Sequence, residues 1–279
     1  MTDVADPVAR DGVLVEVRHA ALNRGDLNDA RSGRVPPGAV LGSDVAGVVL
    51  WGGSLAPGTR VVGLASGAFA ERVVIPADSL AEVPAMVDLA QAAALPVAGV
   101  AALRALRAAG TLLGKRVLIT GASGGVGRFA VRLAKMAGAY VIASVGSLGR
   151  GEGIGADEVV VGLHGIGDPV DVVLDNVGGP QLVAAWRLLA EGGSVQSIGW
   201  SSGEPAVFPP YSTIGPAKSL TSYVTIGPVG ADLADLVSLV AAGQLAVEIG
   251  WRGPLEKFPE AAAALRAREV RGKAVLDVT

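Results

Sequence analysis

Apolar and polar residues alternate in the first part of the chain with the period of a half-buried strand. This alternation is clearest over 12–19. Three more short apolar segments, at 44–52, 58–64 and 68–76, are separated by glycine, proline and other turn residues. Four short strands so close together predict a small, barrel-like β unit. An alanine-rich helical pattern then follows over 89–109, interrupted by proline and glycine.

The middle of the chain has a different pattern, in which continuous apolar strands alternate with helices. A glycine-rich turn and a helix at 128–138 follow the first of these strands, and another helix begins at Gln181. Strand, helix and strand at this spacing predict right-handed βαβ units in a parallel sheet. The predicted strands lie at 115–120, 140–145, 171–177 and 193–200. The last part is helical at 231–242 and 259–268 and ends in a strand at 273–278.

Composition supports this α/β organisation and excludes several classes of protein. Apolar residues make up 51% of the 279 residues and aromatic residues only 4%, so the core must consist of Val, Leu, Ile and Ala. A net charge of -3 gives no basic footprint for nucleic acid. No apolar run is long enough to cross a membrane, and the first residues lack the order of a signal peptide. With no Cys and 2 His, thiolate and histidine zinc sites are not expected. We therefore expect a cytoplasmic, metal-free protein.

The glycine-rich turn reads Gly121-Ala-Ser-Gly-Gly-Val-Gly127 and lies between a predicted strand and a predicted helix. In that context glycines let the backbone approach a pyrophosphate, and the amides of the helix N-terminus attract its charge. The alternative is a merely tight turn. The cofactor-binding residues predicted here are Ser123, Gly124, Gly125, Val126 and Gly127.

The residues at the end of the second strand of this unit, and just beyond it, indicate which dinucleotide is bound. An NAD site usually presents an acidic residue there to hold the ribose hydroxyls. Here the first acidic residue from Ala143 onward is Glu152. Ser144, Ser147 and Arg150 instead suit a 2′-phosphate. The alternative for Arg150 is a solvated loop position. We predict NADP, with NADPH preferred over NADH.

Seven motifs occur in an order that resembles one family. They are Asn23-Arg-Gly-Asp26, Leu41-Gly-Ser-Asp-Val-Ala-Gly47, Pro57-Gly-Thr-Arg-Val-Val-Gly63, Ala94-Leu-Pro96, Gly121–Gly127, Asp175-Asn-Val-Gly-Gly179 and Gly272-Lys-Ala-Val-Leu276. Over essentially its whole length the chain resembles the medium-chain dehydrogenase/reductase superfamily, on its zinc-free side of quinone oxidoreductases and enoyl reductases. Where zinc alcohol dehydrogenases carry Gly-His-Glu, this chain has Gly42-Ser43-Asp44.

The resemblance implies a fold of two domains. A GroES-like catalytic domain would comprise 1–89 and 245–279, shortened at its N-terminus, and a Rossmann NADP-binding domain would comprise 90–244. The family commonly forms homodimers through the edge strand of the Rossmann sheet, here 219–226. An apolar, β-branched edge of this kind seeks a partner.

The resemblance also implies a reaction. The expected activity is NADPH-dependent reduction of an activated C=C or a quinone (an enone, a quinone or an enoyl thioester) by hydride transfer without metal. The nicotinamide donates the hydride and the protein supplies position. The alternative is a non-redox member that guides cyclisation or isomerisation of a polyketide-like intermediate.

Further site residues follow from the family motifs. Asn23 matches the residue near the nicotinamide and substrate, with a structural turn former as the alternative. Lys273 is expected to approach the cofactor phosphate, with a surface charge as the alternative. Five residues at two strand ends are expected to line the nicotinamide and its ribose: Asn176, Val177, Ser197, Ile198 and Gly199.

A proton donor is harder to assign. Tyr211 and Tyr223 are candidates, because a phenol can protonate an enolate, but water can do the same and both side chains could instead serve packing. His19, one of the two histidines, is expected to be a structural residue rather than a catalyst.

Overall fold

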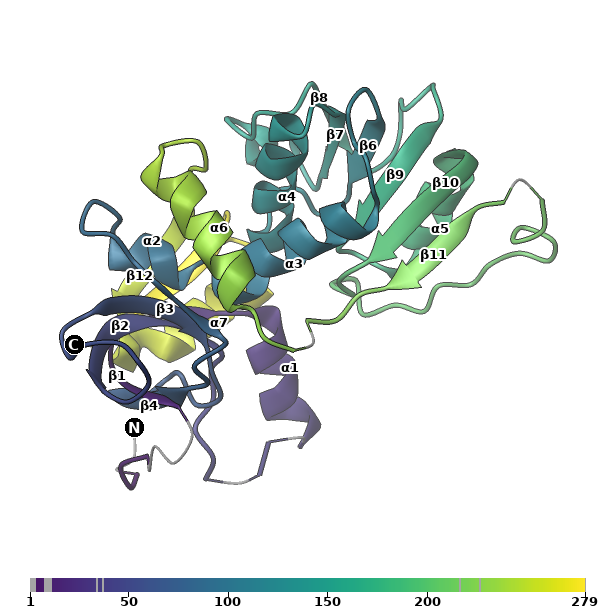
Figure 1. Cartoon of the computed structure of the whole chain (residues 1–279). Coiled ribbons are helices and arrows are strands. Elements are labelled where there is room, and N and C mark those ends of the chain that lie inside the picture. The colour runs from purple at the N-terminus through teal and green to yellow at the C-terminus, as the bar shows by residue number, and fades with distance from the viewer. Residues whose placement is uncertain are drawn as a thin grey trace. The chain divides into compact units, whose positions relative to one another are not determined.

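The chain folds into two compact units (Figure 1). The computed structural model describes residues 4–7, 12–33, 35–36, 38–215, 217–225 and 227–278. Unit 1 holds residues 1–100 and 226–279, and unit 2 holds residues 101–225. The sequence predicted the boundaries after residues 89 and 244. The units instead divide after residues 100 and 225, and the second of these boundaries differs because helix α6 (Gly230–Ala241) packs against strand β5 (Leu80–Glu82) of unit 1.

Unit 1 is built on a seven-stranded sheet with the order β12-β13-β1-β2-β3-β5, in which β4 also pairs with β1. Its neighbouring strands are antiparallel except for β12 and β13. The alternation predicted over 12–19 is present in β1, where Val13, Val15 and Val17 point into the core. Besides β5, the strands of this sheet are β1 (Val13–Leu22), β2 (Asp44–Trp51), β3 (Arg60–Leu64), β4 (Arg72–Ile75), β12 (Ile249–Pro254) and β13 (Lys273–Asp277).

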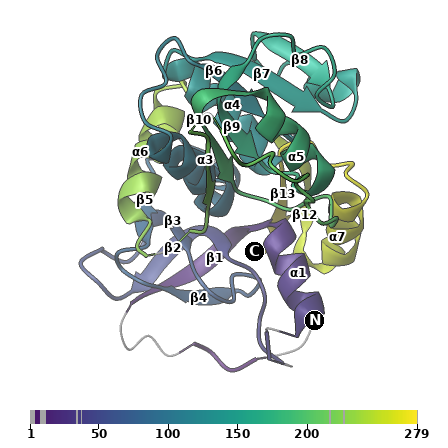
Figure 2. The same ribbon diagram turned by 90° about the vertical axis from the view of Figure 1, so that its right-hand side faces the viewer.

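Helices cover this sheet and close its core. Figure 2 shows α1 (Arg24–Ser32) beside α7 (Phe258–Arg266), and the two helices are in contact. The short helix α2 (Leu89–Ala93) packs on β1 and β2, and the 3-10 turn η2 (Leu255–Lys257) precedes α7. Leu22, Leu27 and Leu276 form the core between α1, α7 and the sheet.

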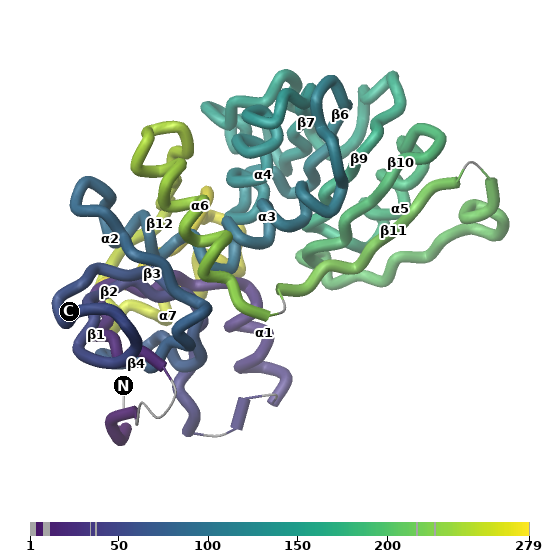
Figure 3. The backbone as a smooth tube through the Cα atoms, in the orientation of Figure 1, coloured from purple at the N-terminus to yellow at the C-terminus, as the bar shows by residue number. Residues whose placement is uncertain are grey.

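Unit 2 contains a six-stranded parallel sheet with the order β11-β10-β9-β6-β7-β8. The chain, which Figure 3 traces as a tube, runs outward from β6 to β8 and then returns to β9 and runs to β11. Ligands of such sheets bind outside the carboxyl ends of the strands at this reversal, which here lies between β6 and β9. The strands are β6 (Arg116–Ile119), β7 (Tyr140–Val145), β8 (Glu158–Val161), β9 (Val170–Asp175), β10 (Leu189–Ser197) and β11 (Ser219–Ser222).

The helices of unit 2 include α4 (Gly125–Met136) after β6 and α5 (Gly179–Leu188) after β9, with a 3-10 turn η1 (Leu148–Gly151) after β7. Helix α3 (Pro96–Ala108) begins in unit 1 and ends in unit 2. Aliphatic side chains from the central strands, such as Leu118, Ile142 and Val173, fill the core. The α/β fold class expected from the sequence is thereby confirmed. Within the described ranges, no helix is long and apolar enough to cross a membrane.

Candidate functional site

The glycine-rich turn connects β6 to α4, and its glycines serve different purposes. Gly121 has φ +59, a left-handed conformation that favours glycine. A Cβ on Gly127 would lie 2.5 Å from the Gly121 carbonyl oxygen and 2.6 Å from Ala122 Cα, so this glycine permits close packing of helix on strand. Gly124 is different, because it is extended and a Cβ there would meet only Gly121 O, at 3.4 Å, among the atoms of the described residues. The protein's own packing therefore gives no reason for a glycine at position 124.

The carboxyl end of β9 is tied to the carboxyl end of β6 by a buried hydrogen-bond network. Thr120 Oγ1 donates to Asp175 Oδ1 at 2.6 Å, and both residues are fully buried. Asp175 Oδ2 accepts from the Gly178 amide at 2.8 Å, while its backbone oxygen accepts from Ile198 and Gly199. Burial raises the pKa of Asp175, and these hydrogen bonds oppose that effect. Asp175 thus ties together three neighbouring strand ends, those of β6 and β9 through its carboxylate and that of β10 through its backbone oxygen.

Asn176 lies at the centre of these strand ends and keeps one polar atom unsatisfied. Its backbone N–H donates to Thr120 Oγ1 at 3.0 Å and its Nδ2 donates to the Thr120 carbonyl at 2.9 Å. Its Oδ1 is buried and has no donor among the described residues. A buried acceptor of this kind fits a ligand hydroxyl, such as one from a ribose. Val177, Ser197, Ile198 and Gly199 are half-buried at the same edge.

A cationic side chain lies beside the glycine-rich turn. Arg150, in η1 after β7, donates from Nε to Ser123 Oγ at 3.1 Å, and Arg128 donates to the Arg150 carbonyl. Ser147 precedes η1 and is exposed. Arg150 is therefore near the strand end where the sequence predicted a 2′-phosphate.

Ser144, predicted for the same phosphate, is engaged elsewhere. It is only 1% exposed, its Oγ donates to Gly162 O at 2.6 Å, and it accepts from Gln181 Nε2 at 2.9 Å. A hydroxyl has one hydrogen to donate, so Ser144 has none left for a phosphate. The structure gives it a role in joining β7 to the turn after β8 and to α5.

In unit 1, Asn23 and Lys273 belong to one buried polar cluster. Lys273 is 3% exposed, and its Nζ donates to Asn23 Oδ1 and to Asp44 Oδ2. Asn23 also donates from Nδ2 to Asp44 Oδ2 at 2.9 Å. Lys273 is thus neither a surface charge nor a side chain open to a phosphate in this structure. Asp44, which stands where zinc alcohol dehydrogenases have the glutamate of Gly-His-Glu, is fully buried at the centre of the cluster.

Asp26 extends this cluster through hydrogen bonds at the start of α1. Its carboxylate accepts from the Asn23 backbone N–H at 2.7 Å and from Ser43 Oγ at 3.0 Å. Burial, and to a smaller degree the charge of Asp44, raises the pKa of Asp26 to about 6. Because this value is above that of a free aspartate, folding favours the protonated carboxyl.

Replacing Asp26 with asparagine is expected to stabilise unit 1 progressively, relative to the native protein, as pH rises from about 4 to about 6. Across that window the native Asp26 ionises at a cost that rises to about 3 kcal/mol, whereas asparagine does not titrate. Urea unfolding at pH 4 and pH 7.5, followed by circular dichroism, measures the difference. Asp168→Asn, at an exposed position, is the control, and a pH-independent difference for Asp26→Asn would contradict the assignment.

The two tyrosines predicted as proton donors occupy different environments in unit 2. Tyr211 is 82% exposed and has φ +66, in the loop between β10 and β11. Tyr223 is half-buried just after β11, and its hydroxyl is 3.3 Å from Thr225 Oγ1. The two hydroxyls therefore do not occupy the same position, and each tyrosine is a separate candidate for the proton donor.

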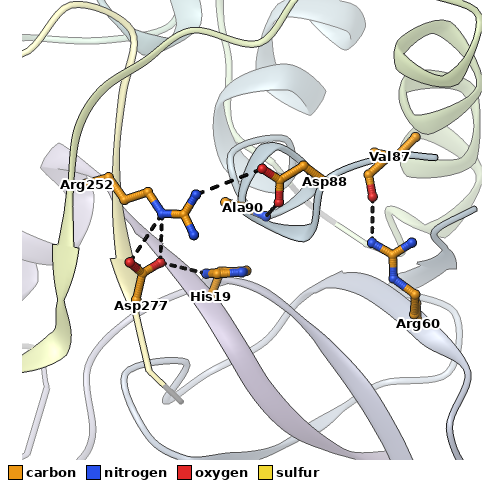
Figure 4. Close-up of polar contacts among 7 residues, drawn as sticks. All are labelled: His19, Arg60, Val87, Asp88, Ala90, Arg252 and Asp277. Atoms are coloured by element: carbon orange, nitrogen blue, oxygen red, sulfur yellow. Dashed lines mark hydrogen bonds and ion pairs between the residues drawn. The ribbon is translucent and has the colours of Figure 1, made fainter. Parts of the chain in front are cut away.

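His19 belongs to a separate ionic cluster of unit 1 (Figure 4). Its Nδ1 is 2.8 Å from Asp277 Oδ1, and Arg252 Nε donates to the same carboxylate at 2.9 Å. Arg252 also lies 3.9 Å from Asp88, whose other oxygen accepts from the Ala90 amide at the start of α2. Burial lowers the pKa of His19, against the opposing effect of Asp277. This arrangement agrees with the structural role expected for the histidine.

The potential metal ligands among the described residues do not form a cluster. Within the parts of the chain that the structure describes, no group of three or more His, Asp or Glu could hold a metal ion. The residues that sequence reasoning missed are Thr120, Asp175 as a network centre, and Asp44. Asp44 and Asp175 belong to sequence motifs, and this was the only sign in the sequence that they matter. Thr120 lies in no motif.

A parallel sheet with a glycine turn at its reversal, joined to a second unit with a mixed sheet, defines a two-domain protein of the dehydrogenase type. Comparisons with known proteins agree. The alcohol dehydrogenase GroES-like domain matches residues 9–85, and the zinc-binding dehydrogenase family matches residues 154–276. The chain belongs to the medium-chain dehydrogenase/reductase superfamily, in its quinone oxidoreductase-like branch. The expected pairing of a GroES-like domain with a Rossmann sheet is confirmed.

Relatives include enzymes and parts of larger proteins. Acryloyl-coenzyme A reductase of Metallosphaera sedula is 31% identical over 71% of this chain and 72% of its own length. Erythronolide synthase EryA2 of Saccharopolyspora erythraea is 35% identical over 87% of this chain, which spans 7% of that protein. The structure of Escherichia coli quinone oxidoreductase complexed with NADPH superposes with a TM-score of 0.88 at 27% identity, covering 100% of this chain and 94% of the other.

Proposed function

We propose that this protein is a zinc-independent, NADPH-dependent reductase of an activated C=C or a quinone, with an enone, a quinone or an enoyl thioester as substrate. The observation that carries the proposal is the glycine turn, where Gly124 has no packing reason to be glycine and Arg150 lies alongside. Space for a pyrophosphate beside a cation fits a phosphorylated dinucleotide. The segment 143–151 contains no acidic residue of the kind that an NAD site presents.

The names of the relatives support this substrate class. An acryloyl thioester and a quinone both contain a C=C conjugated to a carbonyl, and reductases of both are similar to this chain. Absence of a metal is part of the proposal, because Ser43 and Asp44 are committed to hydrogen bonds with Asp26, Asn23, Lys273 and the Val97 amide. The cytoplasmic location expected from the sequence also stays part of the proposal.

The chain's own residues then have distinct tasks. Bound NADPH supplies the hydride. The first turn of α4 and its glycines hold the pyrophosphate, and Arg150 with Ser123 and Ser147 holds the 2′-phosphate. Asn176 accepts from a ribose hydroxyl, and Asn23 orients the groups at the reacting end. Tyr211 and Tyr223 stay candidate proton donors, with water as the alternative.

Titration with NADPH and NADH tests the cofactor assignment. We expect the native protein to bind NADPH more tightly than NADH. Replacing Arg150 with alanine should weaken NADPH binding about 10- to 100-fold and leave NADH binding unchanged, because a hydrogen bond to a charged group contributes about 1.5–3 kcal/mol. Arg187→Ala, on the exposed side of α5, is the matched control. An equal loss for both nucleotides would contradict the assignment of Arg150 to the 2′-phosphate.

The same experiment continues with acceptors. Quinones, enones and enoyl thioesters are added to the NADPH complex, and oxidation of NADPH is followed with and without a chelator. Turnover that the chelator leaves unchanged supports the metal-free reductase. Binding without turnover over the whole panel favours the non-redox alternative, in which a polyketide-like intermediate is cyclised or isomerised. A protein that binds neither nucleotide contradicts the proposal as a whole.

The homodimer expected from the sequence is also proposed here, through β11. This strand is the edge of the parallel sheet and its four residues are exposed. An unpaired edge is prone to pair with another chain. The predicted interface 219–226 extends beyond β11, and residue 226 lies outside the described residues. We expect a dimer at micromolar concentration in sedimentation, and a monomer for Leu220→Lys but not for the exposed control Leu113→Lys. A monomeric native protein would contradict it.

A further inference from the structure

Strand register in unit 1 brings Asn23 and Lys273 together from opposite ends of the chain. β1 and β13 are antiparallel, with Leu22 opposite Ala274 and Ala21 opposite Val275. One position beyond the last pair, Asn23 faces Lys273, whose Nζ donates to Asn23 Oδ1. The contact is therefore set by the backbone pairing of the sheet, and not by the chance reach of a long side chain.

Asp44 is fixed in the same place by a second strand and a helix. β2 pairs with β1 so that Asp44 lies opposite Ala21. Its Oδ2 accepts from Lys273 Nζ at 2.8 Å and from Asn23 Nδ2, and its Oδ1 accepts from the Val97 amide at 2.8 Å. Because Pro96 has no N–H, Val97 presents the first amide of α3, and a carboxylate is favoured there. Both oxygens of Asp44 are thus engaged.

These contacts leave Asn23 a single orientation of its carboxamide. Rotating the amide by half a turn would bring its NH2 against the Lys273 ammonium and its oxygen against the Asp44 carboxylate, and both contacts would be repulsive. Asn23 is half-buried, whereas Lys273 is 3% exposed and Asp44 is fully buried. Of the three, Asn23 is the one that borders solvent. Moving the ammonium to a ligand would also leave the buried carboxylate without its cation.

We propose that Lys273 and Asp44 are positioning residues that hold the Asn23 carboxamide in one orientation, and that Lys273 is not a ligand of the cofactor phosphate. The proposal rests on the proposed function, in which Asn23 orients the groups at the reacting end, and it adds what holds Asn23 in place. Lys273 and Asp44 act through Asn23, which alone is offered to the bound molecules.

A double-mutant cycle distinguishes this role from phosphate binding. The variants are Asn23→Ala, Lys273→Met and the combination, with Lys273→Gln as a polar replacement in case the methionine variant does not fold. We expect each single variant to lower kcat at least 10-fold and the combination to lower it no further than Asn23→Ala does. We expect the Kd for NADPH to stay within 3-fold of the native value throughout. A Kd raised 10-fold or more by the Lys273 variants alone would overturn the proposal in favour of a phosphate ligand.

A second measurement needs neither cofactor nor turnover. The side-chain NH2 signals of Asn23 in a 15N-labelled protein are identified by their loss in Asn23→Ala. We expect the hydrogen that faces Asp44 to exchange slowly in the native protein and rapidly in Lys273→Gln, while backbone amides of β1 stay protected. An unchanged exchange rate in Lys273→Gln overturns the positioning role. If the native protein binds no NADPH, the proposed function fails, and the exchange rate still decides the inference.

Discussion

Replacing Gly124 with valine is expected to weaken NADPH binding at least about 100-fold, a loss of about 2.7 kcal/mol, while leaving unit 2 as stable as before. Its φ of -83 and ψ of -179 are extended values that any residue adopts. A Cβ would have ordinary contact with Gly121 O at 3.4 Å. The added side chain would instead fill the space through which a pyrophosphate approaches the first turn of α4.

Two further glycine variants make this result specific. Gly167→Val places the same side chain at an exposed position of unit 2, where a Cβ meets nothing within 4 Å, and should change neither binding nor stability. Gly127→Val should destabilise unit 2, because its Cβ would collide with backbone atoms of Gly121 and Ala122. NADPH titration and thermal unfolding of the three variants measure both effects. Unchanged affinity in Gly124→Val would contradict the placement of the pyrophosphate.

The glycine turn was predictable because its signal is local. A buried strand, a run of glycines and a helix follow one another within 115–138, and their order alone defines the turn. The parallel strands at 140–145 and 171–177 were predictable for the same reason, since a strand buried on both faces is a continuous apolar run. Gly124 and Gly127 differ, however, in the backbone atoms that an added Cβ would meet, and only the folded chain shows those atoms.

Elements with little apolar periodicity were missed. Helix α1 was not predicted, because in Arg24–Ser32 only Asp26 and Leu27 are buried and no apolar stripe marks the helix. Strand β12 has an alternating burial pattern, but it contains two glycines and a proline, which in a sequence indicate a turn and not a strand. Strands β5 and β8 are short, with three and four residues.

Site residues that depend on long-range pairing were the hardest to interpret. Lys273 is the first residue of a strand, a position that in sequence alone fits a surface charge or a phosphate ligand equally well. Its partners Asn23 and Asp44 lie near the other end of the chain and meet it only through the register of β1 with β13 and β2. Ser144 was selected for its place at the end of an apolar strand, but the sequence could not show that its hydroxyl donates to the Gly162 carbonyl.

The Asp44–Lys273 pair should also be a large contributor to the stability of unit 1. Asp44→Ala is expected to lower the free energy of unfolding by about 3–5 kcal/mol, because removing one partner of a buried ion pair leaves the other charge uncompensated. The Val97 amide and Asn23 Nδ2 would lose their acceptor at the same time. Asp6→Ala is the matched control in the same unit. Its carboxylate pairs with Arg72 at the surface, and such pairs contribute about 0–1 kcal/mol.

Urea unfolding followed by circular dichroism measures the loss of stability. The double variant Asp44→Ala/Lys273→Met shows where the loss of stability comes from, because it removes both buried charges. It should be more stable than Asp44→Ala alone, since the loss in the single variant comes largely from the stranded ammonium and not from the missing attraction. Additive losses in the double variant would mean that Lys273 finds water or another partner once Asp44 is gone. The buried cluster would then be weaker than its hydrogen bonds indicate.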